Sequence, residues 1–153
     1  MKMLTAAVAA LVLAGPAANL KFSFKNTDGR KVALSEFKGK VIILDFWATW
    51  CIPCKEEIPG FIELQKKYGD RGLQIVGISV DDSLNQAKKY ATDMKMNYPV
   101  LLAEGREDIL RAYDPIPGIP VSIIIDRQGR IVTRHDGIAK MDVFEKEILP
   151  LLE

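Results

Sequence analysis

The chain alternates between apolar runs and segments with helical spacing. Two near-continuous apolar runs, 41–47 and 73–80, are rich in β-branched residues, which predicts strands buried on both faces, as in a parallel sheet. Shorter apolar segments predict further strands at 98–102, 121–126 and 131–135. The last two flank a glycine-containing turn and should form a hairpin, so we expect the central sheet to be mixed.

Four helices are expected between and after these strands. Apolar side chains recur at helical spacing in each segment, and glycines or helix-capping residues mark several of the ends. The ranges are 54–68, 84–94, 107–113 and 141–152. Strands that alternate with helices predict an α/β fold in which helices flank a central mixed β-sheet.

A smaller unit precedes the first buried run. Residues 22–24 alternate as a short edge strand does, 26–30 is a turn, and 31–34 returns as the hairpin partner. Residues 35–39 have the pattern of one helical turn that a glycine ends. We therefore expect an N-terminal β-hairpin ahead of the central sheet.

The first 18 residues have the pattern of a targeting segment. Lys2 precedes the apolar run 6–14, and small residues follow it, as in a secretory signal. The run is shorter than the roughly 20 apolar residues that a membrane-spanning helix needs. The alternative is an alanine-rich first helix of the fold. We interpret 1–18 as a signal-like or anchoring segment and 19–153 as one domain.

Composition excludes several functions. The 153 residues carry a net charge of +1, which gives no reason to expect nucleic acid or a polybasic membrane surface as a partner. Two cysteines and one histidine are too few for a four-ligand Cys/His zinc site unless carboxylates complete it. The hydrophobic and charged fractions, 48% and 27%, are those of a folded globular protein, so disorder is not expected.

The two cysteines carry the strongest chemical signal. Cys51-Ile52-Pro53-Cys54 lies where a buried strand passes into a helix. The unpaired N–H groups at such a junction stabilise a thiolate and lower the pKa of a thiol. We therefore expect Cys51 to be the exposed attacking thiol and Cys54 to be the shielded resolving thiol. The alternative is half of a metal site, for which His135 is the one remaining preferred ligand, although its polar surroundings favour a surface position.

Asp45 and two prolines add weaker signals. Asp45 interrupts the first apolar run, where burial should raise its pKa and make it a proton acceptor for Cys54. The alternative is a carboxylate at an edge or a loop. From spacing alone Pro120 is a loop proline, and Pro59 should kink its helix unless the packing accommodates it.

A resemblance to a known family rests on these residues. The segment 45–55, Asp-Phe-Trp-Ala-Thr-Trp-Cys-Ile-Pro-Cys-Lys, is similar to the active-site segment of thioredoxin-fold proteins. Its continuation through Glu57 and Pro59 resembles the exported TlpA/ResA-like thiol–disulfide oxidoreductases, which include reductases that support cytochrome c maturation. The likeness runs from the expected hairpin to the C-terminus.

The resemblance implies a thioredoxin fold and a role for each site residue. Cys51 would be the nucleophile, Cys54 the resolving thiol and Asp45 the buried acid. Pro120 would be the cis-proline that lies against the dithiol and receives the substrate backbone. Residues 82–107 would be the helix-and-strand insertion that distinguishes this subfamily from thioredoxin itself.

Two positions near the site are less clear. Asp82 falls near an acidic position that is important in some cytochrome-maturation members, but ahead of the helix at 84–94 it is more simply interpreted as a helix cap. The loop 114–120 is about one residue longer than the pattern of the family. Ile119 rather than Thr or Arg precedes the proline, which indicates an apolar recognition surface.

Together these features predict thiol–disulfide exchange with protein substrates. The expected substrate contacts are apolar, namely Trp50, Ile52, Pro53, Ile119 and Pro120. The Ile-Pro dipeptide lacks the histidine that would stabilise the thiolate of a strong oxidant, which together with the buried acid favours a reductant. No metal, organic cofactor or nucleic acid is expected.

The expected setting is outside the cytoplasm. We expect a monomer that is exported to the periplasm or tethered facing it, with a cytoplasmic location as the alternative. The resemblance implies an upstream thiol electron donor embedded in the membrane.

Two other functions stay open. A thiol peroxidase would use Cys51 with Thr49, which lies two residues before it, although the aromatic loop differs from what that chemistry needs. A metal-binding or chaperone module would use the cysteine pair as ligands.

Overall fold

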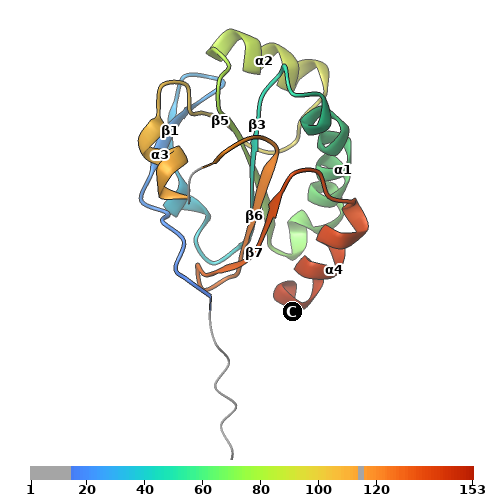
Figure 1. The fold of residues 1–153 in the computed structure, drawn as a ribbon. Helices are drawn as coiled ribbons and strands as arrows, with labels where there is room; N and C mark the ends of the chain where they lie inside the picture. The colour runs from blue at the N-terminus through green and yellow to red at the C-terminus, as the bar shows by residue number, and fades with distance from the viewer. Residues whose placement is uncertain (1–14, 114–115) are drawn as a thin grey trace, which may run out of the picture.

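The computed structural model describes residues 15–113 and 116–153 and contains a mixed seven-stranded sheet with helices on both faces (Figure 1). The strands lie in the order β2-β1-β5-β4-β3-β6-β7. Their bounds are Ser23–Asn26 for β1, Lys31–Ala33 for β2, Val41–Trp47 for β3, Leu73–Ser79 for β4, Val100–Leu102 for β5, Val121–Ile125 for β6 and Ile131–Asp136 for β7. The predicted α/β class is confirmed.

The four predicted helices are also present. They are α1 (Ile52–Tyr68), α2 (Leu84–Asp93), α3 (Glu107–Ala112) and α4 (Met141–Leu152). The turn expected at 35–39 is a 3-10 helix, η1 (Leu34–Phe37), and a second one, η2 (Gly69–Arg71), follows α1. Figure 1 shows α1 and α4 together on one side of the sheet and α3 on the other. α1 continues through Pro59 without a break.

Strand β3 forms the middle of the core. It pairs in parallel with β4 and antiparallel with β6, and all seven of its residues are buried. Side chains alternate between the faces: Leu44 and Phe46 join the cluster beneath α3, whereas Ile43 joins the cluster beneath α1 and α4. The apolar run therefore reflects burial on both faces, as its composition indicated.

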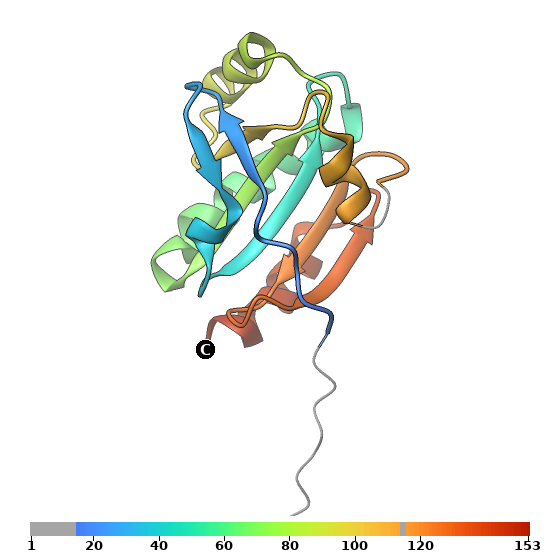
Figure 2. The same ribbon diagram turned by 90° about the vertical axis from the view of Figure 1, so that its left-hand side faces the viewer.

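The N-terminal hairpin is confirmed, but β1 is not an edge strand. It pairs with β2 on one side and with β5 on the other, and β2 forms the edge (Figure 2). Strand β5 belongs to the expected insertion and comes from more than 70 residues later in the chain. The prediction was wrong because only the tertiary fold brings β5 beside β1.

The proposed boundary at residue 18 falls within a segment that pairs with the domain. The Ile131 N–H donates to the Pro16 carbonyl at 2.8 Å, and the Ala18 N–H donates to the Gly129 carbonyl at 2.9 Å. The apolar run 6–14 lies outside the described residues. Within the described part of the chain, no helix combines the length and apolar character needed to cross a membrane.

Candidate active site

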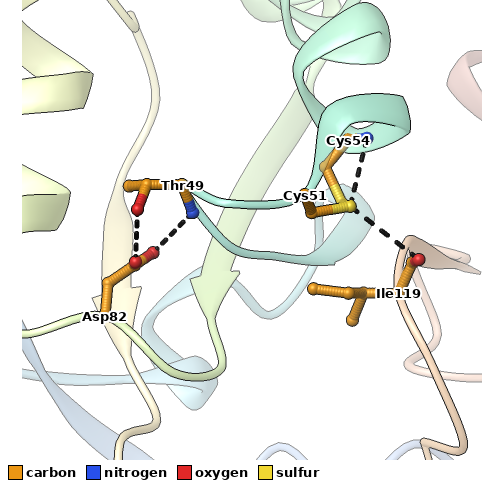
Figure 3. Close-up of a disulfide and its surroundings, with 5 residues drawn as sticks. All are labelled: Thr49, Cys51, Cys54, Asp82 and Ile119. Atoms are coloured by element: carbon orange, nitrogen blue, oxygen red, sulfur yellow. Dashed lines mark hydrogen bonds between the residues drawn. A yellow bond between two sulfur atoms is a disulfide. The ribbon is translucent and has the colours of Figure 1, made fainter.

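The cysteine pair sits at the N-terminus of α1, just after β3. Cys51 is the N-cap residue, and its Sγ accepts a hydrogen bond from the Cys54 N–H at 3.3 Å. The two residues form a disulfide with 5.3 Å between their Cα atoms (Figure 3). Pro53 fits the first turn because its missing N–H would have no partner within the helix. The helix terminus therefore faces the sulfur atoms with its free N–H groups, an arrangement that favours a thiolate.

Cys51 is more enclosed than expected, whereas Cys54 is shielded as expected. Cys51 is 4% exposed and Cys54 is 1% exposed. The prediction that Cys51 is exposed was therefore wrong for the disulfide form, although Cys51 does keep the greater access. The sequence could not show this, because the covering segment 118–120 is remote in the chain.

That segment brings Pro120 against the dithiol. The Ile119 carbonyl oxygen lies 3.8 Å from the Cys51 Sγ (Figure 3), and the Ile119–Pro120 peptide bond is cis. Pro120 is buried and Ile119 is partly exposed. Spacing alone indicated an ordinary loop proline, whereas the resemblance predicted the cis-proline that the structure contains.

Exposed apolar side chains lie next to Cys51 in the chain. Trp50 and Ile52 are 61% and 71% exposed, which is high for residues of this size. Pro53 is also exposed, and Ile119 approaches from the facing loop. These four residues form the apolar rim of the site, and such exposed patches commonly bind other proteins.

Asp45 is buried on the face of β3 that α1 covers. It is 1% exposed, and neither carboxyl oxygen has a hydrogen-bond partner within the described residues. Burial, followed by the nearby charge of Glu57, raises the pKa of Asp45 well above its ordinary value. The alternative of a carboxylate at an edge or loop is wrong, and this carboxyl can hold a proton where most aspartates cannot.

Glu57 is a site residue that the sequence reasoning did not single out. It lies one helical turn after Cys54 and is 2% exposed, and one of its oxygens accepts from the Ala139 N–H at 2.8 Å. Burial raises the pKa of Glu57, while the Ala139 N–H and the His135 charge lower it. The i, i+3 spacing from Cys54 was the available signal, because residues so spaced share one helix face.

Asp82 is a tether rather than a helix cap. Ser83 caps α2, whereas Asp82 is buried and accepts from the Thr49 N–H at 2.8 Å and the Thr49 hydroxyl at 2.5 Å (Figure 3). The Ser79 hydroxyl donates to the same carboxylate at 2.6 Å. These bonds hold the loop before Cys51 to the end of β4. They also direct Thr49 toward Asp82, which removes the residue on which the peroxidase alternative relied.

His135 is partly exposed, on the edge strand β7. Its side chain is 19% exposed and lies 2.8 Å from the Glu147 carboxylate through Nε2. No group of three or more His, Cys, Asp or Glu side chains arranged to hold a metal ion occurs among residues 15–113 and 116–153. The histidine is therefore engaged with α4 rather than with the cysteine pair.

A dithiol at a helix N-terminus, faced by a cis-proline on a mixed sheet of this order, defines a thioredoxin-fold thiol–disulfide oxidoreductase. The AhpC/TSA family matches residues 15–134, and the chain belongs to that family.

Individual relatives carry the same description. The thiol-disulfide oxidoreductase ResA of Bacillus thuringiensis is 33% identical over 132 residues, which cover 84% of this chain and 75% of that protein. ResA of Bacillus subtilis is 35% identical over 111 residues, covering 72% and 61%. The crystal structure of a thiol:disulfide interchange protein of the thioredoxin family from Chlorobium tepidum matches with a TM-score of 0.82 and 33% identity, covering 94% of this chain and all of that one.

Replacing Asp45 by Asn should stabilise the disulfide form increasingly as pH rises. A raised folded pKa means that the folded protein binds more protons than the unfolded chain above about pH 4, so the parent loses stability as pH rises through the folded pKa. The difference between Asp45→Asn and the parent should grow by about 1.4 kcal/mol per unit of pKa shift. Urea unfolding between about pH 4 and pH 8 measures it. The exposed control Asp70→Asn should show no such trend. A difference between Asp45→Asn and the parent that does not change with pH would contradict the raised pKa of Asp45.

Replacing Asp82 by Ala should destabilise the fold by about 2–4 kcal/mol, because three donors lose a charged acceptor in a partly buried place. The neighbouring Asp81→Ala is the matched control, since Asp81 is exposed and should change stability by less than about 0.5 kcal/mol. Urea unfolding of the two variants measures the change in the free energy of unfolding that each substitution causes. Equal effects would mean that the tether does not hold the loop.

Proposed function

We propose that this oxidoreductase reduces protein disulfides outside the cytoplasm. The observation that carries the proposal is the position of the dithiol, with Cys51 at the helix N-terminus and the unpaired Asp45 buried behind it. The N-terminus of the helix favours the attacking thiolate, and a carboxyl with a raised pKa is suited to exchange a proton with the second thiol. The apolar start of the chain, 6–14, supports export.

The proposed reaction transfers two electrons from the dithiol to the substrate. The Cys51 thiolate attacks one sulfur of the substrate disulfide, so that a mixed disulfide forms and the other substrate sulfur leaves as a thiolate. Cys54 then gives its proton to Asp45, and its thiolate attacks the Cys51 sulfur. The Cys51–Cys54 disulfide closes and the second substrate sulfur leaves.

Substrate recognition is assigned to the apolar rim. Trp50, Ile52 and Pro53 come from the start of α1 and the loop before it, and Ile119 comes from the loop before β6. A substrate segment placed over Cys51 would therefore meet apolar side chains from both. The buried Pro120 would support the backbone of that segment. We propose a monomer that needs no metal or organic cofactor, and an upstream dithiol protein, embedded in the membrane, that reopens the disulfide.

Cys54→Ser should accumulate a mixed disulfide between Cys51 and its substrates, because the resolving thiol is gone. Cys51→Ser should abolish insulin reduction and trap nothing. Non-reducing electrophoresis with mass spectrometry identifies the trapped partners. The double variant Cys51→Ser/Cys54→Ser controls for proteins that associate without forming a disulfide. Insulin reduction that persists in Cys51→Ser would overturn the assignment of the nucleophile.

The reduction potential decides the direction. We expect a value more negative than about −150 mV, since the dipeptide between the cysteines offers no imidazole to stabilise the thiolate. Equilibration with glutathione redox buffers, followed by alkylation of the free thiols, measures the potential. A more positive value would make the protein an oxidant.

A further inference from the structure

A row of polar side chains crosses the sheet on the face that α1 and α4 cover. In the strand register, Asp45 of β3 lies opposite Ser122 of β6, and Ser122 lies opposite His135 of β7. Residues directly opposite each other on antiparallel strands point to the same face, with Cβ atoms about 4.5–5.5 Å apart. The three side chains therefore follow one another from the middle of the sheet to its edge.

Contacts with α4 place the outer end of the row at the surface. The His135 ring packs edge-on against Phe144 with 4.9 Å between ring centres, and its Nε2 lies 2.8 Å from the Glu147 carboxylate. His135 and Glu147 are 19% and 26% exposed at their side chains. Asp45 and Ser122, by contrast, are fully enclosed. The row therefore leads from the core to a histidine–carboxylate pair that reaches solvent.

The inner end of the row contains polar atoms without partners. Both carboxyl oxygens of Asp45 and the Ser122 Oγ have no hydrogen-bond partner within the described residues. An unpaired buried polar group costs about 1–3 kcal/mol, and such groups commonly bond to internal water or serve a function. The adjacent cross-strand pair on the same face, Ile43 and Ile124, is wholly apolar, so the sheet does not need polar residues here to pack.

We infer that this row is the route by which the proton accepted by Asp45 leaves the protein. Ser122, with water between the groups, passes the proton from Asp45 to His135, and Glu147 holds the imidazole at the surface. A hydroxyl both donates and accepts a hydrogen bond, and each ring nitrogen of an imidazole can donate or accept one. Ser122 and His135 act through Asp45: they position the proton that Asp45 releases.

The inference rests on the proposed role of Asp45. In the resolving step Cys54 gives its proton to Asp45, and its sulfur closes the disulfide. The protonated carboxyl then passes that proton along the row and becomes a carboxylate again, while His135 is an imidazolium until solvent takes the proton. No electrons move in this transfer, and the reverse path returns a proton to Cys54 when an upstream dithiol reopens the disulfide.

Other titratable groups face the two ends of the row. Burial and then the charge of Glu57 on α1 raise the pKa of Asp45. Burial and then the charges of Asp45, Tyr90 and Glu57 raise the pKa of Tyr98, which lies before β5. Glu147 on α4 and Glu57 face His135.

The charged neighbours of His135 along its own strand point away from the row. Arg134 and Asp136 alternate to the opposite face of β7, where they pair with each other at 2.9 Å. Glu57 offers an alternative route for the proton, because one of its oxygens accepts a hydrogen bond from the Ala139 N–H beyond the end of β7.

The test isolates the resolving step. Reduced protein in excess over 5,5′-dithiobis(2-nitrobenzoate) releases one thionitrobenzoate when Cys51 attacks and a second when Cys54 closes the disulfide. The protein is first held at acidic pH, where the raised pKa favours the protonated Asp45, or at about pH 8, and is then mixed with reagent at the higher pH. The parent should give the same rate of second release from both incubations, because the row empties the carboxyl during mixing.

Ser122→Ala and His135→Gln should slow the release of the second thionitrobenzoate about tenfold after the incubation at acidic pH. After the incubation at about pH 8 they should leave this rate unchanged. The first release should not change, and the double variant should be no slower than the slower single variant, since both interrupt one route. A merely structural role would slow both incubations alike. Thr133→Val is the matched control, because Thr133 lies on the same strand and face as His135 but opposite Ile124.

Three further outcomes separate the role of the row from the role of Asp45. If Asp45→Asn slows the second release while Ser122→Ala behaves as the parent, the row is not the route although the role of Asp45 stands. If Glu57→Gln produces the acid-dependent delay instead, the proton leaves through Glu57. If Asp45→Asn resolves as fast as the parent, the proposed role of Asp45 fails and the row fails with it. Ser122→Ala removes a single oxygen, so it carries the test even if His135→Gln does not fold.

Discussion

The complete burial of β3 is the constraint on which the rest of the structure depends. The strand is enclosed by β4 and β6 at its sides and by helices on both faces, so any charge on it must be neutralised or paired. Among the described residues neither carboxyl oxygen of Asp45 has a hydrogen-bond partner, and burial, followed by the nearby charge of Glu57, raises the pKa of this carboxyl. The same strand ends just before the cysteine pair, which lies at the start of α1, so consecutive elements carry the buried carboxyl and the dithiol.

The loop between β3 and α1 is held from two directions. Asp82 binds Thr49 from the end of β4, and the Ile119 carbonyl approaches Cys51 from the loop before β6. Neither contact belongs to the cysteine motif itself, yet together they determine how far the sulfur atoms are covered. In the disulfide form Cys51 is accordingly only 4% exposed.

Much of the fold followed from pattern alone. Buried strands and amphipathic helices were predicted close to their observed bounds because each element has its own periodicity. The errors arose where distant segments meet. The edge position of β1 and the capping role of Asp82 were each inferred from neighbours in the chain, whereas β5 and Thr49 are neighbours only in space. Glu57 was overlooked as a site residue although its i, i+3 spacing from Cys54 was a local signal.

The sequence by itself determined the dithiol, its place at a strand-to-helix junction and the acidic residue within an apolar strand. These are local properties, set by residue type and spacing. Only the tertiary structure decided that Asp45 lies opposite Ser122, that Ser122 lies opposite His135, and that a cis-proline faces Cys51. Strand register depends on pairing between segments remote in the chain, and the energy of a buried charge depends on everything that surrounds it.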